Sequence, residues 1–388
     1  MDFGLTPEQE KLRQRVSDFL DRELTDEIRK QHPMGTGLGP EGRAFARKLG
    51  AEGLMGIGWP KEYGGSGGTF ADEYVLVTEF ARHGARVPME CARLMGGPAI
   101  LRFGSEAMKQ EFLPRIARGE IEFGLGYTEP QAGSDLMMME MRAVQDGDDY
   151  IINGQKMFNT ACHYADYHFL AVKTDFTAPR HSSMSMFVVD QRAPGITIRP
   201  LWSLGGERTN EIFYDNVRVP KSRLIGEKNM GFLYLLTALN HERLLLFPIE
   251  WYKPVLQRLI KYTKETRRNG RLLADDPVVR QKLADIAIEL EVIYCIQCQA
   301  FSMISNGGEP DFETGLAKLM GSELTVRLGY CAMDIMGFPG RLGEGSKEAP
   351  LNGEMDWFCK ESILATVGGG SSEIQRNLLA MRGLGLPR

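Results

Sequence analysis

Residues that could bind a metal or a redox partner occur twice in the chain, and their spacing argues against both sites. His241 and Glu242 begin like the zinc helix H-E-x-x-H, but Leu245 stands where the second histidine is needed. Cys295 and Cys298 form a C-x-x-C, yet no second pair lies near and the surrounding apolar residues follow a helical pattern. We therefore expect structural cysteines and no metal site.

Nucleotide-binding motifs of the familiar kind are also missing. No G-x-G-x-x-G follows a predicted strand and no G-x-x-x-x-G-K-[ST] occurs, while the glycine-rich segment at 35–40 is interpreted as a loop. Glycine is nevertheless abundant, at 44 of 388 residues, about 11% against a usual ~7%. The surplus indicates either special turns or a ligand held close to the backbone.

Three polar segments are the most specific patterns in the chain. They read YTEPQAGSD at 127–135, NGQKMFNT at 153–160 and VGGGSSEIQRNLLAMR at 367–382. Four further segments accompany them: WPKEYGG at 59–65, RFGSEAMKQEFLPRIARGE at 102–120, DNVRVP at 215–220 and LNHERLLL at 239–246. In this order and spacing, over essentially the whole chain, they resemble the acyl-CoA dehydrogenase family of flavoproteins. The terminal GLGLPR resembles the branch rich in actinobacterial enzymes for bulky or sterol-derived acyl chains.

The resemblance implies an enzyme that oxidises an acyl-CoA thioester to the trans-2-enoyl-CoA with FAD. A carboxylate removes the α-proton while the β-hydrogen leaves as hydride to the flavin N5. Such a site needs a positioned base, a donor to the thioester carbonyl and a slot without water. The family binds FAD without a dinucleotide-binding fold, so the missing G-x-G-x-x-G is expected. Electrons would pass to an electron-transfer flavoprotein or an equivalent acceptor.

The catalytic base is expected at Glu242. Many relatives carry the base near the C-terminus, where this chain has Gly369, whereas isovaleryl- and long-chain-type members carry it in L-x-x-E-R, as at Glu242. An apolar slot would raise its pKa above the usual ~4.3. The alternative is a surface glutamate paired with an arginine, against which the following LLLF speaks. His241 lies about 100° around the helix and is not expected to act.

Gly369 can keep a role through its backbone. In the family, the N–H of this position donates to the thioester carbonyl, with the flavin ribityl hydroxyl as the second donor, and this stabilises the enolate-like charge. Asn240 and Arg243 match positions on the CoA side, and their i, i+3 spacing puts them on one helix face. With Ser134 these residues make up the expected substrate site.

The cofactor site is carried over position by position. Thr128 should bond the edge of the isoalloxazine ring, Ser134 should lie by the pyrophosphate and the acyl-CoA, and Thr160 should approach flavin N5. Phe158 replaces the Trp of many relatives, which keeps an aromatic wall without its N–H, and it shares one face of a predicted strand with Thr160. Ordinary turn and sheet hydrogen bonding is the alternative for the polar members. The remaining expected contacts are Leu125, Tyr127, Gly133, Ser371 and Glu373.

One departure concerns the adenine end of FAD. Thr266 and Asn269 stand where relatives carry an Arg and a Phe that reach the FAD of a neighbouring subunit, and Asp334 replaces a glutamine. A guanidinium group to bind the pyrophosphate could come instead from one of three arginines nearby: Arg267, Arg268 or Arg271. We expect a homo-oligomer, dimer or tetramer, or a heteromer whose partner completes the site. Two other functions are possible on the same fold: a thioester oxidase or desulfinase, and a non-catalytic subunit that completes a partner's FAD site.

The elements that must position these residues form an α–β–α order, hence an α+β fold. We expect an N-terminal helical domain at 1–122, a middle antiparallel β-domain at 123–228 and a C-terminal four-helix bundle at 229–388. Hairpin signals stand at 146–147 (DG) and 153–154 (NG). Thr6 followed by Pro7 predicts a helix start, with a cap and then proline at the first helical position. The expected helical stretches are 5–24, 41–53, 70–84, 89–103, 105–117, 230–268, 276–306 and 312–336.

Composition bounds the partners and the compartment. The net charge of −5 leaves no basic footprint for nucleic acid. The first residues show no secretory signal, and no apolar run reaches the ~18 residues of a membrane span. Six scattered cysteines indicate a reducing compartment, so we expect a bacterial cytoplasmic protein.

Overall fold

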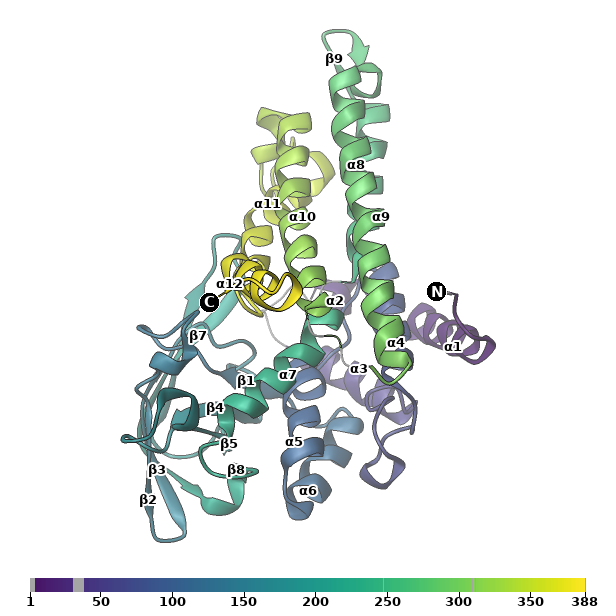
Figure 1. Ribbon diagram of the computed structural model, residues 1–388. Coiled ribbons are helices and arrows are strands. Elements are labelled where there is room, and N and C mark those ends of the chain that lie inside the picture. Colours follow the sequence, from purple (N-terminus) through teal and green to yellow (C-terminus); the bar gives the residue numbers. More distant parts are fainter. Residues whose placement is uncertain (1–3, 31–37, 247, 309, 311, 388) are drawn as a thin grey trace. The chain divides into compact units, whose positions relative to one another are not determined.

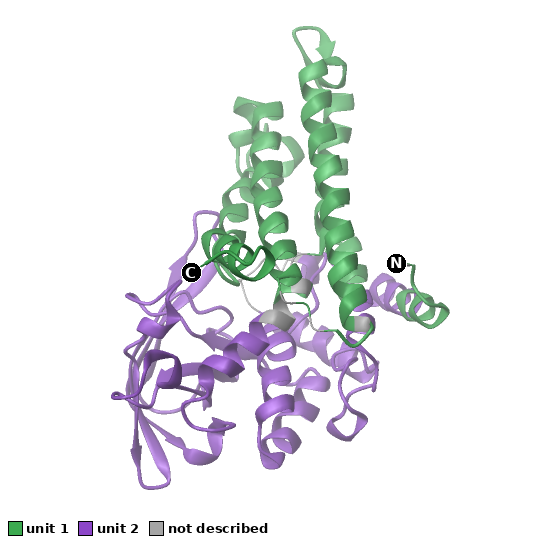
Figure 2. Cartoon of the chain, viewed as in Figure 1, with its two compact units in different colours: residues 1–13, 77–84, 243–388 green, residues 14–76, 85–242 purple. Residues whose placement is uncertain are grey.

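The structure is a computed structural model that describes residues 4–30, 38–246, 248–308, 310 and 312–387, without the side chains of 30, 240–242, 244, 246 and 305. Part of the loop expected at 35–40 lies outside these residues. The chain divides into two compact units, shown in Figure 2. Unit 1 comprises 1–13, 77–84 and 243–388, and unit 2 comprises 14–76 and 85–242.

Helices precede the sheet, as the periodicity predicted (Figure 1). They are α1 (Pro7–Glu23), α2 (Asp26–Lys30), α3 (Pro40–Ala51), α4 (Phe70–Arg82), α5 (Gly97–Phe103) and α6 (Glu106–Ala117). Thr6 and Gln9 exchange hydrogen bonds at the start of α1, with Pro7 as its first residue, so the predicted helix start is confirmed. The segment expected as a helix over 89–103 is helical from Glu90 to Phe103, with a π-helical turn, η2 (Ala92–Gly96), inside it before α5.

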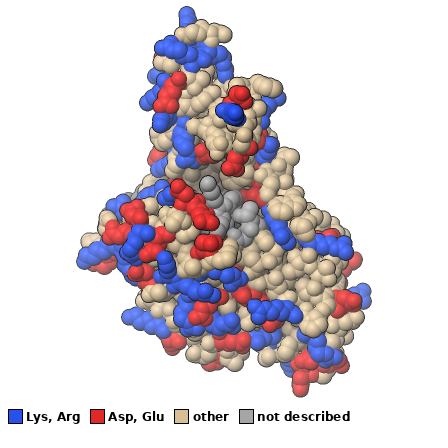
Figure 3. Space-filling model, turned by 180° about the vertical axis from the view of Figure 1, so that it is seen from behind, with Lys and Arg blue, Asp and Glu red and all other residues tan. Residues whose placement is uncertain are grey.

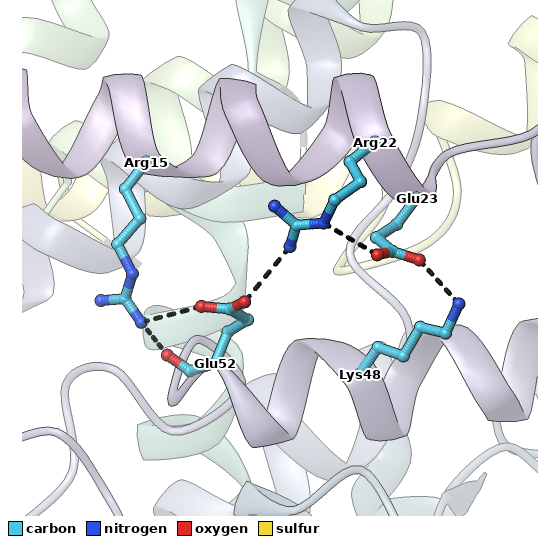
Figure 4. A network of polar contacts seen from close by, with 5 residues as sticks. All are labelled: Arg15, Arg22, Glu23, Lys48 and Glu52. Carbon is cyan, nitrogen blue, oxygen red and sulfur yellow. Dashed lines mark hydrogen bonds and ion pairs between the residues drawn. The ribbon is translucent and has the colours of Figure 1, made fainter.

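Within unit 2, α1 packs against α3. The rings of Phe19 and Phe45 meet with centroids 5.5 Å apart. A chain of ion pairs runs along the same contact (Figure 4), and its members are Arg15, Arg22, Glu23, Lys48 and Glu52. Because most of these side chains are solvent-exposed, the ion pairs add little to stability, and the apolar contact carries the packing.

The strands of unit 2 form one sheet in the order β6-β7-β3-β2-β4-β5-β8, with β1 beside β4. They are β1 (Phe123–Gly126), β2 (Arg142–Asp146), β3 (Asp149–Lys156), β4 (Tyr167–Lys173), β5 (Met184–Asp190), β6 (Ile196–Trp202), β7 (Arg208–Pro220) and β8 (Leu224–Ile225). The β-domain is not purely antiparallel as expected, because β1 runs parallel to β4 and β2 meets β4 in parallel at Arg142. Inward side chains of these strands form the core of the sheet.

The two hairpin signals have different outcomes. The DG at 146–147 does join β2 to β3, with Asp146 opposite Asp149 and Gly147 at φ +63°. The NG at 153–154 does not form a turn. It lies inside β3, where the register with β7 shifts between Ile152 and Gly154, and Gly154 has φ +142°. The glycine there supports a β-bulge.

The C-terminal helices form a bundle within unit 1. The elements of this part of the chain are α7 (Gly231–Leu246), α8 (Tyr252–Glu265), β9 (Arg267–Arg268), β10 (Arg271–Leu272), α9 (Pro277–Ser305), α10 (Glu313–Met336), α11 (Glu354–Ala365) and α12 (Ser372–Leu378). The long helix expected over 230–268 is broken between α7 and α8, where Pro248 cannot continue a helix. Side chains from α8, α9, α10 and α11 share one core.

One helix meets the length and composition of a membrane span among the described residues, although the sequence showed no sufficiently long apolar run. Within Pro277–Ile304 of α9, an 18-residue window has a mean hydropathy of 1.3, and a third of that window is buried inside the chain. Core helices of water-soluble proteins meet the same criterion. The finding is therefore weak evidence for a membrane span.

Candidate active site

Two of the chemistry-bearing segments meet in unit 2, where β1 ends and the chain leaves β3. Leu125 N–H donates to the carbonyl of Thr160 at 3.1 Å, and Met157 N–H donates to that of Thr128 at 2.9 Å. The Asn159 Nδ2 donates to the Leu125 carbonyl at 2.7 Å. Hydrogen bonds thus tie Leu125 and Thr128 to the segment 157–160, which includes Phe158 and Thr160, and all four residues are ones that the sequence led us to expect at a flavin.

A buried ion pair holds the same two segments together. Lys156 Nζ lies 2.8 Å from Glu129 Oε1 and donates to the Tyr127 carbonyl at 2.9 Å, and the two charged side chains are 0% and 2% exposed. Burial lowers the pKa of Lys156 to about 8, against the opposing effect of Glu129. The Glu129 carboxylate also accepts from the backbone of Glu140 and Met141. Sequence reasoning missed this pair, although both residues lie inside the quoted motifs.

Phe158 and Thr160 do not lie on a strand, so the period-two argument for them was wrong. β3 ends at Lys156, and Phe158 takes a positive φ of 57° in the turn that follows. The side chains still alternate between exposed and buried, because Asn159 is buried while its neighbours Phe158 and Thr160 are exposed. The Phe158 ring is 60% exposed, an unusual placement for a large aromatic side chain. Their expected contacts with flavin remain predictions.

The turn after β1 is open. Gly133 and Ser134 are exposed, whereas Tyr127 and Thr128 are half-buried. A Cβ added to Gly133 would meet no atom within 4 Å, so no neighbour in the described chain explains a glycine there. A ligand close to the backbone would explain it.

In unit 1, three buried side chains converge on the glycine loop between α11 and α12. Arg243 Nε and Gln375 Nε2 donate to the Gly369 carbonyl at 3.0 and 3.1 Å. Lys318 Nζ donates to the Gly370 carbonyl at 2.7 Å. Gly369 and Gly370 have φ of +69° and +96°, a conformation that side chains disfavour. Sequence reasoning placed Arg243 and Gly369 near substrate but gave no role to Lys318 or Gln375.

Glu242, the expected base, lies near the end of α7, and its side chain is outside the described residues. The same holds for the side chains of Asn240 and His241. The backbone of α7 includes Asn240 and Arg243, which keeps their i, i+3 spacing on one helix. Their predicted roles remain predictions.

The remaining expected cofactor residues of unit 1 lie at the start of α12. Ser371 caps this helix and its Oγ accepts from the Ile374 N–H at 3.4 Å. A hydrogen bond from its own backbone N–H, and then one from the Ser371 hydroxyl, lower the pKa of Glu373 below its ordinary value. Ser371 and Glu373 therefore both take part in hydrogen bonds at the start of α12, whether or not they also contact a ligand.

The arginines considered for the adenine end lie on the β9–β10 hairpin, which Figure 1 shows at the far end of α8 from α12. Arg268 Nη2 donates to the carbonyls of Ile335 and Met336 at 2.7 and 3.2 Å, so it caps the end of α10. Arg267 donates to Gly270 within the hairpin, and Asp334 is paired with Lys282 at 2.8 Å.

Metal and disulfide chemistry find no support in the described part of the chain. Among the described residues, no group of three or more His, Cys, Asp or Glu side chains is arranged so that it could hold a metal ion. Cys295 is exposed and Cys298 buried, and both are free thiols. Burial raises the pKa of Cys298, which disfavours the reactive thiolate.

The residues of unit 2 fit a flat aromatic cofactor with polar edges. The exposed Phe158 ring offers an apolar surface, and the Asn159 Oδ1 beside it is buried without a hydrogen-bond partner in the described residues. In unit 1, the fixed glycine loop presents backbone that a ligand can approach closely.

Comparison with known proteins covers nearly the whole chain. Three family models match it in order: acyl-CoA dehydrogenase, N-terminal domain, at residues 6–120, the middle domain at 124–217 and the C-terminal domain at 229–384. Acyl-CoA dehydrogenase FadE26 of Mycobacterium tuberculosis is 34% identical over 398 residues, which cover 100% of this chain and 99% of the relative.

Solved structures give the same answer. A protein described as the Tcur3481-Tcur3483 steroid ACAD matches with a TM-score of 0.91 at 34% identity. The ChsE4-ChsE5 complex from Mycobacterium tuberculosis matches with a TM-score of 0.90 at 34% identity. Each match covers 100% of this chain and 100% of the other. The similarity therefore extends over the N-terminal helices, the sheet and the C-terminal helices alike.

Proposed function

This chain belongs to the acyl-CoA dehydrogenase family of oxidoreductases, and on that premise we propose that it converts an acyl-CoA thioester into the trans-2-enoyl-CoA with FAD. The observation that carries the proposal is the Gly369 loop. Its carbonyl side is held by buried donors, while the Gly369 N–H donates to no acceptor among the described residues. That N–H is available to a substrate carbonyl.

Each residue then has a role. Glu242 takes the α-proton, because no carboxylate stands at Gly369 and a base must come from elsewhere. The Gly369 N–H accommodates the charge that grows on the thioester oxygen. Asn240 and Arg243 serve the CoA side, and Arg243 also holds the loop through its Nε.

The cofactor would be held in two parts of the chain. Phe158 flanks the ring, Thr128 and Thr160 bond its edge, and Ser134 lies by the pyrophosphate, with Ser371 and Glu373 contributing from the start of α12. When bound, FAD supplies the hydride acceptor at flavin N5. The exposed Phe158 ring and the open turn at Gly133 support this assignment. We keep the three-domain division at 1–122, 123–228 and 229–388 as part of the proposal.

A bulky acyl chain is the proposed substrate class. The absence of a side chain at Gly369 leaves room near the α and β carbons, which favours branched, cyclic or long acyl groups. One similar structure is described as a steroid enzyme. Turnover confined to short straight chains would contradict this assignment.

Two assemblies fit the sequence. The chain forms a homo-oligomer, or it joins a homologous partner that completes the adenine site, because Thr266 and Asn269 replace the usual clamp. A similar structure is a complex of two named chains, which supports the second assembly. Electron-transfer flavoprotein or an equivalent acceptor would reoxidise the enzyme, in a bacterial cytoplasm.

The test is flavin reduction by a panel of acyl-CoA thioesters under anaerobic conditions. The purified protein should be yellow, and at least one bulky acyl-CoA should bleach it; oxygen uptake in air would instead indicate the oxidase alternative. Glu242→Gln should keep FAD and lose at least about 100-fold in reduction rate. A variant that bleaches at the wild-type rate would show that Glu242 is not the base.

A further inference from the structure

The loop that follows α11 has unusual freedom for a segment at a reaction centre. Gly368, Gly369 and Gly370 carry no side chains to restrict it, and the last two take φ of +69° and +96°. Glycine loses more backbone freedom on ordering than any other residue. Something outside the loop must therefore hold it in one conformation.

Three side chains of unit 1 supply that restraint, and all of them donate hydrogen bonds to carbonyl oxygens of the loop. Arg243 of α7 and Gln375 of α12 donate to the Gly369 oxygen, and Lys318 of α10 donates to the Gly370 oxygen. Lys318 and Gln375 are 0% exposed, and Arg243 is 7% exposed. A Cβ on Gly370 would come within 2.6 Å of Gln375 Nε2, so the donors are packed directly against the backbone.

Lys318 is the member whose presence most needs an explanation. Taking an ammonium group out of water is costly unless hydrogen bonds replace the lost hydration. Its 2.7 Å bond to the Gly370 carbonyl is one such replacement. A shorter apolar residue would fill the helix interior without that cost, so a fully buried lysine at this point is best explained by what it holds.

The restraint fixes the direction of the loop's amides. A peptide unit is planar, so holding the Gly369 and Gly370 oxygens fixes the peptide planes on both sides of Gly370, and the Gly369 N–H belongs to the unit just before them, between Gly368 and Gly369. The Gly368 N–H is tied to the Leu364 carbonyl at 3.1 Å, which secures the loop's other end. Between these anchors, the Gly369 N–H donates to nothing in the described chain.

We propose that Lys318, assisted by Gln375, is a positioning residue: by holding the peptide units that follow Gly369, it keeps the Gly369 N–H where it meets the thioester carbonyl of the substrate. The inference rests on the proposed function, in which that N–H polarises the carbonyl. In this role Lys318 itself touches neither substrate nor cofactor. Preorganised donors of this kind are worth about 100- to 1000-fold in rate, and misplacement by about 1 Å costs on the order of 100-fold.

The test compares Lys318→Met and Gln375→Met with Ser372→Ala in the FAD-loaded protein. Ser372 is a fitting control because its buried Oγ has no hydrogen-bond partner in the described residues and does not touch the loop carbonyls. Gln375→Met guards against a folding defect in the lysine variant, since it also removes a buried amide oxygen that has no partner there. FAD content and melting temperature are recorded for all variants.

Three measurements separate positioning from mere stability. Hydrogen exchange of the amides at 366–371 should accelerate about tenfold in Lys318→Met, a measurement that needs no substrate. 4-Dimethylaminocinnamoyl-CoA, whose absorption moves to the red when its carbonyl accepts hydrogen bonds, should show a smaller red shift than in the wild type. Flavin reduction should slow about 10- to 100-fold while the dissociation constant of the acyl-CoA changes by less than about threefold.

The outcomes for this role and for the proposed function are distinguishable. If Lys318→Met and Gln375→Met match Ser372→Ala in loop exchange, red shift and reduction rate, the positioning role is overturned while the function stands. If the wild type is reduced by no acyl-CoA and shifts no probe, the proposed function is overturned, whatever the loop exchange shows.

Discussion

At the scale of single residues, Glu122 is a buried carboxyl group outside the candidate site whose pKa is strongly raised. It is 1% exposed at the start of β1, and its Oε1 accepts from the N–H groups of Ala92 and Phe123, both at 2.8 Å. Burial raises its pKa from 4.5 to about 8; Glu90 adds to the rise, and the two backbone donors and Arg43 oppose it. Glu122 therefore ties β1 to the π-helical turn η2 at an electrostatic cost.

This cost predicts a pH dependence of stability. Between about pH 4.5 and 8 the folded state keeps a proton that the unfolded chain has released, so the free energy of unfolding falls as the pH rises. Glu122→Gln keeps an acceptor for both N–H groups and removes the titration. It should flatten the melting temperature between pH 5 and 8 and raise stability at pH 8 by on the order of a few kcal/mol.

Thermal unfolding of both proteins across that pH range checks the prediction. Glu120→Gln is the control, because Arg118 lowers the pKa of this exposed carboxyl group and its titration lies below the window. A parallel pair of profiles for wild type and Glu122→Gln would contradict the assigned pKa.

Residue identity points to one part of the proposed site and gives no sign of another. Gly369 and Glu242 could be singled out because a missing carboxylate at one motif position coincided with a carboxylate at another. Lys318 and Gln375 could not, because their partners are backbone carbonyls about 50 and 6 residues away, and no side-chain pattern records a hydrogen bond to a carbonyl. Only the fold brings them together.

At the scale of elements, the ion pair between Lys156 and Glu129 links two segments that carry the expected cofactor contacts. Removing one partner leaves the other charge buried, so Lys156→Met should reduce the free energy of unfolding by about 3–5 kcal/mol. The double variant Lys156→Met with Glu129→Gln should lose less, because no uncompensated charge remains. Urea unfolding monitored by tryptophan fluorescence measures both.

Lys360→Met is the matched control for this pair. Lys360 lies 2.6 Å from Asp356 on α11 but is 40% exposed, so its loss should cost under about 0.5 kcal/mol. A double variant that is no more stable than Lys156→Met would argue that packing around the lysine stem, and not the buried charge, dominates.

Turns show why element boundaries were only partly predictable. Asn-Gly at 153–154 was taken as a hairpin but is a bulge inside β3, since its neighbours on both sides pair with β7. A true Asn-Gly hairpin stands at Asn269 and Gly270 between β9 and β10, with φ of +53° and +80°, and β9 lies at the end of the stretch expected as a helix over 230–268. The dipeptide permits either structure, and the partner strands decide.

At the scale of the whole molecule, the distribution of charge and apolar surface bears on assembly. On the face shown in Figure 3, Lys and Arg are interspersed with Asp and Glu, in keeping with the net charge of −5. The outer face of α9 is different. Ile288 is 62% and Val292 44% exposed, and Cys295 continues the stripe at helical spacing.

Such a stripe can be covered by a second chain or by lipid, and a pair of lysines on it distinguishes the two. Ile288→Lys with Val292→Lys places two charges on adjacent turns, where burial against another chain would strip their hydration. If α9 is a subunit interface, the wild type should elute as an oligomer without detergent, and the variant should shift toward the monomer with little loss of its own melting temperature. Size-exclusion chromatography with light scattering measures the mass.

Val144→Lys serves as the control, because Val144 is a similarly exposed valine, 53% on β2, with a charge added away from α9. It should keep the mass of the wild type. A wild type that stays aggregated unless detergent is present would favour lipid as the cover of α9, in line with its mean hydropathy of 1.3. A double-lysine variant with unchanged mass would place the subunit contact elsewhere.

Because the adenine end of FAD is expected to depend on a neighbouring subunit, loss of the oligomer should also lower FAD retention, which links assembly to the cofactor.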